Sequence, residues 1–458
     1  MDAIRLAGQS KSMLRGAVLT APIGSDSLTR QALSRAASSY HGANEAARSL
    51  TPSRWNALRS FDIARMNRAV AICHWGSSGS FLIASLLDGH PDVVMMPMLF
   101  SRSIYPFFQE CGFLSVWEKL IAYPAYSAAK MPYGDFFLED PNADGAIDAG
   151  TYYAAIHALF DVYGDRPAEW LDARLRFFQF VHIAYAVAAD RRMEGEQPII
   201  VYAQHDVNQE LAQAFVEDFP SGQFIHTVRD PITSFDSWSD KHLSKKKDTH
   251  HGRPDLASYY LDSAIPAVAD LLAWDHSNVG MDARTRAVRF EDLHLATEST
   301  MRRLADWLRM PYRDCLLEST WNGKRYLVNA GGASWCGPNP AKAQRSQKNL
   351  NWADRLTIFA LLHDNFTAWN YPIPRLLHRR WMRVCVLAMF WLLPMKVELA
   401  NAGVILRLQI LPKLRRGEIG FALVAPFYLL KRRLRMALII AKEARLRLLG
   451  RGALMKLL

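Results

Sequence analysis

Four short, predominantly apolar segments, each followed by a segment typical of a helix, most constrain the fold of this chain. They are residues 69–73, 199–203, 224–228 and 287–290. Strands that are buried on both faces are apolar along their length, and strands that alternate with helices form a parallel sheet. The sequence therefore predicts an α/β fold, with a central parallel sheet flanked by helices and a ligand at the carboxyl ends of the strands. Between the first two segments we expect mainly aromatic-rich helices.

The first of these segments leads into a loop of glycine and serine, Gly76-Ser-Ser-Gly-Ser80, which precedes an apolar helix predicted over residues 81–87. Such a turn directs backbone N–H groups and a helix N-terminus toward one point, where they favour an anion. The loop lacks the Gly-Lys-Ser/Thr sequence of a Walker motif, which argues against a nucleoside triphosphatase. Turns of this composition are also common without a ligand, so the loop alone leaves both interpretations open.

A second candidate motif begins at the end of the segment 224–228. Arg229 follows this predicted strand, Pro231 suits the first turn of the next helix, and Ser237 lies about two turns into that helix. A guanidinium and a hydroxyl that converge on one phosphate would bind it through charge-assisted hydrogen bonds. Taken alone, the motif is equally compatible with an ordinary Arg–Asp pair at the start of a helix.

In this order, the motifs resemble those of the sulfotransferase family that uses the sulfate donor PAPS (3′-phosphoadenosine 5′-phosphosulfate). Residues 77–83, followed by Leu-Leu-Asp-Gly-His-Pro91, resemble its first motif, and Arg229-Asp-Pro with Ser237 resembles its second. Residues 288–293, Val-Arg-Phe-Glu-Asp-Leu, resemble a third. The resemblance covers roughly residues 69–372. It implies a P-loop-like sulfotransferase fold and in-line transfer of a sulfuryl group from PAPS to an acceptor hydroxyl.

The resemblance also implies which residues bind the donor, which would be a co-substrate in a reaction that needs no metal. They are Ser77, Ser78, Gly79, Ser80 and Phe81 in the loop, with Arg229 and Ser237 at the 3′-phosphate. The chain departs from the family where Ser77 replaces a Lys or Arg and Phe81 replaces a hydroxyl residue. Four other basic residues are candidates for the missing cation, and the sequence does not rank them: Arg68, Lys241, Arg289 and Arg345.

The acceptor hydroxyl needs a base, and the candidate is His205. This residue follows the predicted strand 199–203, and Ala203-Gln-His205 resembles a Lys-Thr-His stretch whose histidine is the base in cytosolic family members. Imidazole suits this task because its ordinary pKa lies near the operating pH. Two alternatives stay open, namely a carboxylate base at Glu291 or Asp206, and a histidine that only begins a helix.

Charge is distributed unevenly along the chain. Residues 375–458 hold 18 Lys/Arg and three acidic residues, a net charge of +15, so the other residues carry −4 of the total of +11. Two apolar runs in this region, 384–395 and 419–430, are broken by prolines and are shorter than the roughly 18–20 residues of a membrane span. Helices with apolar faces and basic flanks lie at the surface of anionic membranes.

This region therefore predicts a basic, amphipathic, helical tail that binds an anionic membrane surface. Nucleic acid is the competing polyanion, but the density of Leu, Phe and Trp favours lipid, so no nucleic-acid partner is expected. A helix that merely completes the core of the catalytic domain is the alternative. We expect an N-terminal extension at residues 1–66, loosely ordered or helical, a catalytic domain at 67–374 and the tail at 375–458.

Composition and cysteine usage indicate the compartment. The chain has 458 residues, of which 50% are hydrophobic, so it can build a core and is not a disordered chain. Its five cysteines are scattered, with no CxxC spacing, and no convincing signal peptide is present, so we expect a cytoplasmic protein at the inner face of the membrane.

The predicted function is sulfuryl transfer from PAPS to a hydroxyl of a glycolipid or another membrane-associated carbohydrate acceptor. One alternative is a small-molecule sulfotransferase with an oligomerising tail. The other is a catalytically dead, sulfotransferase-like membrane scaffold, which the missing cation at Ser77 would support.

Overall fold

The computed structural model describes most of the chain between residues 50 and 392. The described ranges there are 50–74, 78–130, 147–191, 197–204, 209–237, 284–330, 333–343 and 350–392. Further on they are 394–396, 406–417, 419–420, 456–458 and a number of single residues. Most of the predicted N-terminal extension lies outside the described residues, as do Ser77 and His205.

The chain divides into two compact units. The first comprises Met1–Cys73, Ser80–Ile225 and Asp292–Asn339, and the second comprises His74–Gly79, His226–Glu291 and Pro340–Leu458. This division follows contacts in space, and the domain boundaries predicted after residues 66 and 374 stay predictions.

A five-stranded sheet in the order β2-β3-β1-β4-β5 forms the centre of the fold. Strand β3 pairs in parallel with both β1 and β2, and Ala69 of β1 lies opposite Ile200 of β3. The strands are buried because they are apolar, and the predicted α/β fold with a central parallel sheet flanked by helices is confirmed. The strands are β1 (Arg68–His74), β2 (Val93–Phe100), β3 (Ile199–Gln204), β4 (Gln223–Val228) and β5 (Thr285–Arg289).

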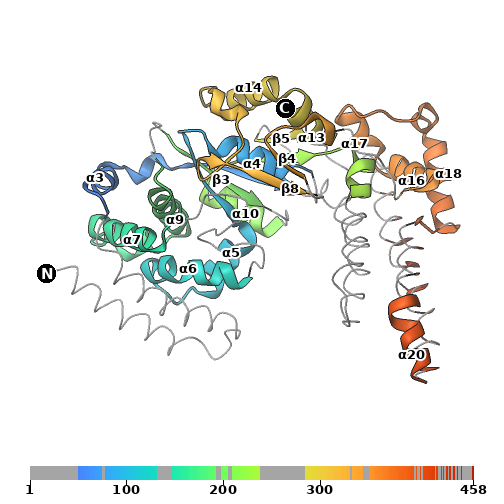
Figure 1. The fold of residues 1–458 in the computed structure, drawn as a ribbon, viewed down its shortest axis with the longest axis horizontal. Helices are drawn as coiled ribbons and strands as arrows, with labels where there is room; N and C mark the ends of the chain where they lie inside the picture. Colours follow the sequence, from blue (N-terminus) through green and yellow to red (C-terminus); the bar gives the residue numbers. More distant parts are fainter. Residues whose placement is uncertain are drawn as a thin grey trace. The chain divides into compact units, whose positions relative to one another are not determined.

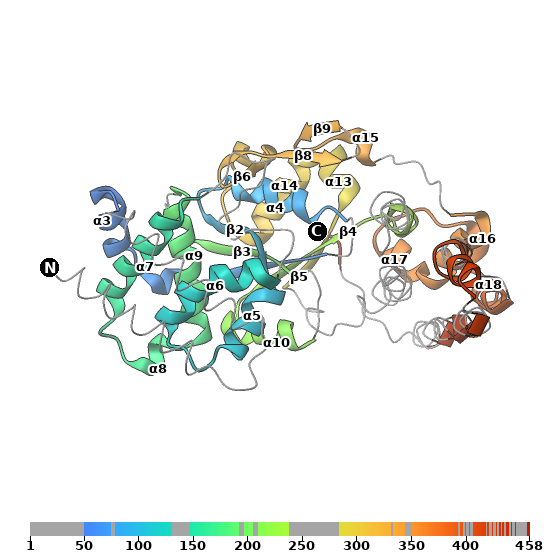
Figure 2. The same ribbon diagram turned by 60° about the horizontal axis from the view of Figure 1, so that its bottom comes forward.

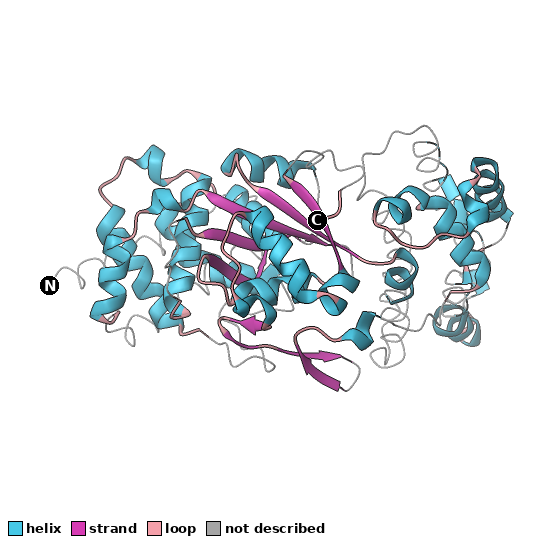
Figure 3. Cartoon of the chain, turned by 90° about the horizontal axis from the view of Figure 1, so that it is seen from above, coloured by secondary structure: helices cyan, strands magenta, loops and turns pink. Residues whose placement is uncertain are grey.

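Helices cover both faces of β2 and β3 (Figure 3). In Figures 1 and 2, α4 (Ser80–Asp88) and α14 (Thr297–Leu308) lie on one side of these strands, with α5 (Ser101–Glu110), α9 (Arg174–Ala188) and α10 (Gln209–Asp218) on the other. The remaining elements of the first unit are α3 (Pro52–Ser60), α6 (Val116–Lys130), α7 (Ala149–Tyr163), α8 (Ala168–Leu171) and two hairpins, β6–β7 (Thr320–Trp321, Lys324–Arg325) and β8–β9 (Leu327–Ala330, Ala333–Cys336).

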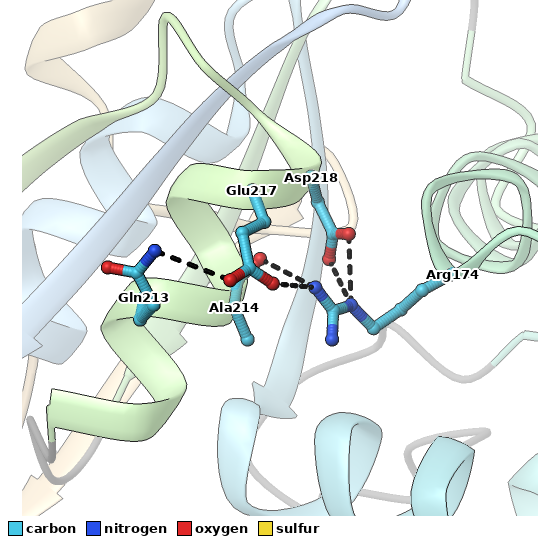
Figure 4. A network of polar contacts seen from close by, with 5 residues as sticks. All are labelled: Arg174, Gln213, Ala214, Glu217 and Asp218. Atoms are coloured by element: carbon cyan, nitrogen blue, oxygen red, sulfur yellow. Dashed lines mark hydrogen bonds and ion pairs between the residues drawn. The ribbon is translucent and has the colours of Figure 1, made fainter.

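An ion-pair network fixes α9 to α10, the helix that follows β3 (Figure 4). The Nε of Arg174 donates to both carboxylate oxygens of Asp218, at 2.7 and 2.9 Å, and its Nη2 donates to Glu217 and to the carbonyl of Ala214. Gln213 donates in turn to Glu217. Because the Asp218 side chain is only 7% exposed, this pair is better shielded from solvent than an ordinary surface pair.

The core of the second unit joins residues on both sides of the predicted boundary at residue 374. Val228 of β4 and Ala287 of β5 belong to the same buried cluster as Val386 and Leu387. The beginning of the predicted tail therefore packs into a core. The helices of this unit are α15 (Pro340–Ala343), α16 (Trp352–Leu361), α17 (His363–Ala368), α18 (Arg380–Leu392) and α20 (Leu411–Arg415).

The last three residues of the chain lie alongside β5. The Ala287 N–H donates to the carbonyl of Lys456 at 2.8 Å, and the Leu458 N–H donates to the carbonyl of Ala287 at 3.0 Å. These bonds place Leu457 opposite Ala287 in parallel orientation. The end of the chain thus extends the edge of the sheet at β5.

The described part of the tail exposes many large apolar side chains. No helix among the described residues is long and apolar enough to cross a membrane. The described residues between 424 and 445 are all helical, and their exposed apolar members are spaced by three or four positions, so they share one helix face. These members are Val424, Phe427, Leu430, Leu434 and Leu438, each more than half exposed.

Candidate functional site

The described end of the glycine–serine loop is held tightly in place. The hydroxyls of Ser78 and of Thr227 in β4 are hydrogen-bonded at 2.8 Å in the interior. Gly79 has a φ of +97°, which L side chains rarely adopt, and a Cβ there would lie 2.5 Å from Cδ2 of Phe290. The position therefore requires glycine for both its backbone and its surroundings, as a loop that presents its backbone to an anion would.

The loop leads directly into α4, as predicted. Ser80 is the first residue of this helix and is buried. Phe81 follows, 42% exposed, with its ring stacked on that of Trp321 at 6.4 Å between centroids. Because Ser77 lies outside the described residues, the full set of loop contacts to a donor stays a prediction.

Arg229 follows the last residue of β4 and is buried, at 6% exposure. Its guanidinium lies 4.2 Å from the centre of the Phe290 ring, and its Nη2 donates to the carbonyl of Lys342 at 3.5 Å. Phe290 is also the residue that a side chain at Gly79 would strike. One aromatic ring therefore brings the loop and Arg229 together, a role that the sequence pattern did not reveal.

The second motif forms a compact turn. The helix begins at Pro231, as predicted, and its described part ends at Ser237, which is 5% exposed. A carboxylate oxygen of Asp230 accepts from the Thr233 N–H at 2.8 Å and so caps this helix. Arg229 and Ser237 thus belong to one strand–turn–helix segment, and their joint contact with a phosphate stays a prediction.

Glu291 is engaged at both carboxylate oxygens. Oε1 accepts from the Asp230 N–H at 3.2 Å, and Oε2 accepts from the Tyr371 hydroxyl at 2.6 Å. Burial raises the pKa of the Glu291 carboxyl, while the hydrogen bonds from Tyr371 and Asp230 lower it. Burial raises the pKa of Tyr371 as well, so this residue stays a phenol that donates. Glu291 is therefore placed to hold structure, and the alternative of Glu291 as the base loses support.

The position of each cation along its strand separates the candidates for the missing charge. Arg68 begins β1, at the end away from the loop, and donates to the carbonyl of Leu308. Arg289 ends β5, and its guanidinium lies 4.5 Å from the centre of the Tyr371 ring. Since ligands bind at the carboxyl ends of parallel strands, Arg289 is the better placed of the two. The other two candidates, Lys241 and Arg345, lie outside the described residues.

The register of the sheet bears on the predicted base. Cys73 near the end of β1 lies opposite Gln204 at the end of β3. His205 and Asp206 come next in the chain, so they leave the sheet at the edge where the glycine–serine loop leaves β1. Both lie outside the described residues, and the role of His205 stays a prediction. In the described part of the chain, no His, Cys, Asp and Glu residues are grouped in a way that could hold a metal ion.

Comparisons with known proteins identify one family. A family model described as "Sulfotransferase family" matches residues 72–314, just over half of the chain. No curated protein matches.

Among solved structures, three sulfotransferase chains are similar in part. For sulfotransferase STF9 from Mycobacterium avium, identity is 14%, coverage is 69% of this chain and 84% of that one, and the TM-score is 0.32. For the sulfotransferase domain from the curacin biosynthetic pathway, the values are 15%, 70%, 97% and 0.32. For sulfotransferase STF1 from Mycobacterium tuberculosis H37Rv, they are 14%, 69%, 89% and 0.30.

Proposed function

Because this chain belongs to the sulfotransferase family, we propose that it transfers a sulfuryl group from PAPS to a hydroxyl of a glycolipid or another membrane-associated carbohydrate. The observation that supports PAPS as donor is the common packing of Gly79 and the buried Arg229 against Phe290. This packing holds together an anion-type loop and a guanidinium, which suits a donor with anionic groups at both ends.

In the proposed reaction, the chain positions two substrates and neutralises charge. Backbone N–H groups of the loop at Ser78 and Gly79 would face the phosphosulfate, and Arg229 with Ser237 would bind the 3′-phosphate. The acceptor oxygen forms a bond to sulfur as the bond from sulfur to the bridging phosphate oxygen breaks, and adenosine 3′,5′-bisphosphate leaves. His205 takes the proton of the acceptor hydroxyl. Positioning and charge stabilisation of this kind supply most of the catalysis in phosphoryl transfer, which is analogous.

Transfer of label from ³⁵S-labelled PAPS tests this function. The full chain is incubated with total lipid, polysaccharide and small-molecule extracts, and we expect label in a lipid-extractable product. Label only in soluble small molecules would favour the small-molecule alternative. If the chain binds no adenosine 3′,5′-bisphosphate in calorimetry, the scaffold alternative replaces the enzyme.

The acceptor class is tied to the second part of the proposal, peripheral association with the inner face of a membrane through the tail. Its support is the exposed apolar stripe on residues 424–438, together with the +15 charge of residues 375–458. Each basic residue near an anionic surface contributes about 1 kcal/mol, and each large apolar side chain that becomes fully buried contributes roughly 1.5–3 kcal/mol. Basic side chains that are exposed in the same region are Arg415, Arg416, Lys431 and Arg445.

Replacing Phe427, Leu430 and Leu434 together by serine is expected to abolish flotation with vesicles that contain anionic lipid. High salt should release the unmodified chain only in part, since salt screens charges over about 10 Å at 0.1 M but leaves apolar burial intact. Vesicle flotation, with Leu295→Ser as the control, measures both effects, because Leu295 is 56% exposed on α13, outside the tail.

Two results would contradict membrane docking. One is a full-length chain that ignores anionic vesicles. The other is a stable dimer in solution that the triple serine variant dissociates, because the apolar stripe would then be covered by a second copy of the chain. Light scattering coupled to gel filtration distinguishes this case.

A further inference from the structure

Two chain segments far apart in the sequence meet at the carboxylate of Glu291. One is the turn Arg229–Asp230, whose N–H at Asp230 donates to Oε1. The other is the segment after α17, where the Tyr371 hydroxyl donates to Oε2 across 80 residues of sequence. Glu291 itself follows directly on Phe290, the ring that carries the Arg229 guanidinium.

We propose that Glu291 and Tyr371 are positioning residues that hold the Arg229–Asp230 turn in the geometry that binds a 3′-phosphate. This role rests on the proposed function, because it assigns the 3′-phosphate of the donor to Arg229. Neither residue would touch the donor; both would act through Arg229.

The hydrogen bonds around Asp230 explain how the turn is held. Its N–H is bonded to Glu291, and its own carboxylate caps the helix at Thr233. The residue next to Arg229 is therefore fixed on both its backbone and its side chain. A buried carboxylate that loses one of its donors is left with an uncompensated desolvation cost, so Glu291 keeps this position only while both donors are present.

The Tyr371 hydroxyl is itself held in direction. Its ring lies between the Arg289 guanidinium, 4.5 Å from the ring centre, and the ring of Phe366, 6.2 Å away in a T-shaped arrangement. Tyr371 is 7% exposed, and its phenol belongs to the core cluster that also contains Val228, the residue before Arg229. The brace is thus built on packed elements, as a group that must be placed precisely requires.

Calorimetry with two nucleotides separates positioning from general damage. Adenosine 3′,5′-bisphosphate carries the phosphate assigned to Arg229, and adenosine 5′-monophosphate lacks it. Tyr371→Phe is expected to weaken binding of the bisphosphate about tenfold and to leave binding of the monophosphate unchanged. Glu291→Ala should have at least the same effect. Glu291→Gln should restore part of it, because the amide can still accept from Asp230 and meet Tyr371.

Tyr163→Phe is the matched control. The Tyr163 hydroxyl is also buried and donates to the carbonyl of Phe61 at 2.9 Å, in the other compact unit. Its loss should lower the thermal midpoint of unfolding as much as Tyr371→Phe does, with no change in affinity for the bisphosphate.

Three results would overturn the proposal in distinguishable ways. If Tyr371→Phe weakens both nucleotides equally, the residue is only structural. If it weakens neither while Arg229→Ala weakens the bisphosphate selectively, the brace is wrong and the 3′-phosphate site stands. If Arg229→Ala shows no selectivity for the bisphosphate, the proposed donor site itself is wrong. Should Tyr371→Phe fail to fold, Glu291→Gln, which keeps the size of the side chain, decides by the same comparison.

Discussion

Replacement of His205 by alanine is expected to lower kcat by about 10²–10⁴. The imidazole would take the proton of the acceptor hydroxyl, and this contribution is made in the transition state rather than in donor binding. Affinity for adenosine 3′,5′-bisphosphate should therefore stay unchanged. Steady-state sulfuryl transfer to the lipid acceptor measures the first quantity, and calorimetry measures the second.

Asp206→Asn and Glu291→Gln are the controls for His205. Asp206 adjoins His205 in the chain, and the carboxylate oxygens of Glu291 are already bonded to Asp230 and Tyr371. We expect Asp206→Asn to keep most of the turnover and Glu291→Gln to affect donor affinity more than kcat. An alanine variant of His205 that retains its turnover would move the role of the base to Asp206.

The fold could be predicted from the sequence wherever burial alone determines the pattern. Strands β1, β3, β4 and β5 match the four apolar segments, because each is short and covered on its faces. Strand β2 was missed, and helix was expected there. Its run contains Pro97, which argues against a strand in general but is tolerated at an edge, and β2 is the edge strand next to β3.

The site could be predicted only where it is local in the sequence. The loop at Ser78 and Gly79 and the turn at Arg229 each follow a strand, so spacing reveals them. Phe290 and Tyr371 could not be assigned, because their roles arise from contacts with residues far away in the chain, such as the 80-residue separation of Tyr371 and Glu291. Periodicity reports which face of an element is buried, but not which distant hydroxyl or ring meets it.

The tail shows the same limit from another side. Its charge could be counted from the sequence, and this count motivated a separate surface element. The structure places Val386 and Leu387 in a core with Val228 and sets Leu457 beside Ala287. A charge count cannot show such returns, because a basic chain packs its apolar residues as any other chain does. For this reason the test of membrane docking uses substitutions on the exposed stripe rather than a deletion.

Arg229→Ala is expected to weaken binding of adenosine 3′,5′-bisphosphate by about tenfold to more than a hundredfold. A hydrogen bond to a charged group contributes roughly 1.5–3 kcal/mol, and 1.4 kcal/mol corresponds to a factor of ten. The upper part of this range applies because Arg229 is 6% exposed, so solvent screens its interaction little. Calorimetry of the full chain with the bisphosphate measures the change.

Two matched variants and one ligand make this result specific to the 3′-phosphate. Ser237→Ala should cost only about 1 kcal/mol, because a neutral hydroxyl is lost. Arg286→Ala removes an arginine near the opposite end of β5, where its Nη1 donates to the carbonyl of Thr285, and should leave affinity unchanged. Adenosine 5′-monophosphate should bind the Arg229 variant as it binds the unmodified chain, since it has no phosphate for the guanidinium. If the Arg229 and Ser237 variants bind the bisphosphate normally, the 3′-phosphate lies elsewhere, and Arg289, stacked on Tyr371, becomes the next guanidinium to replace.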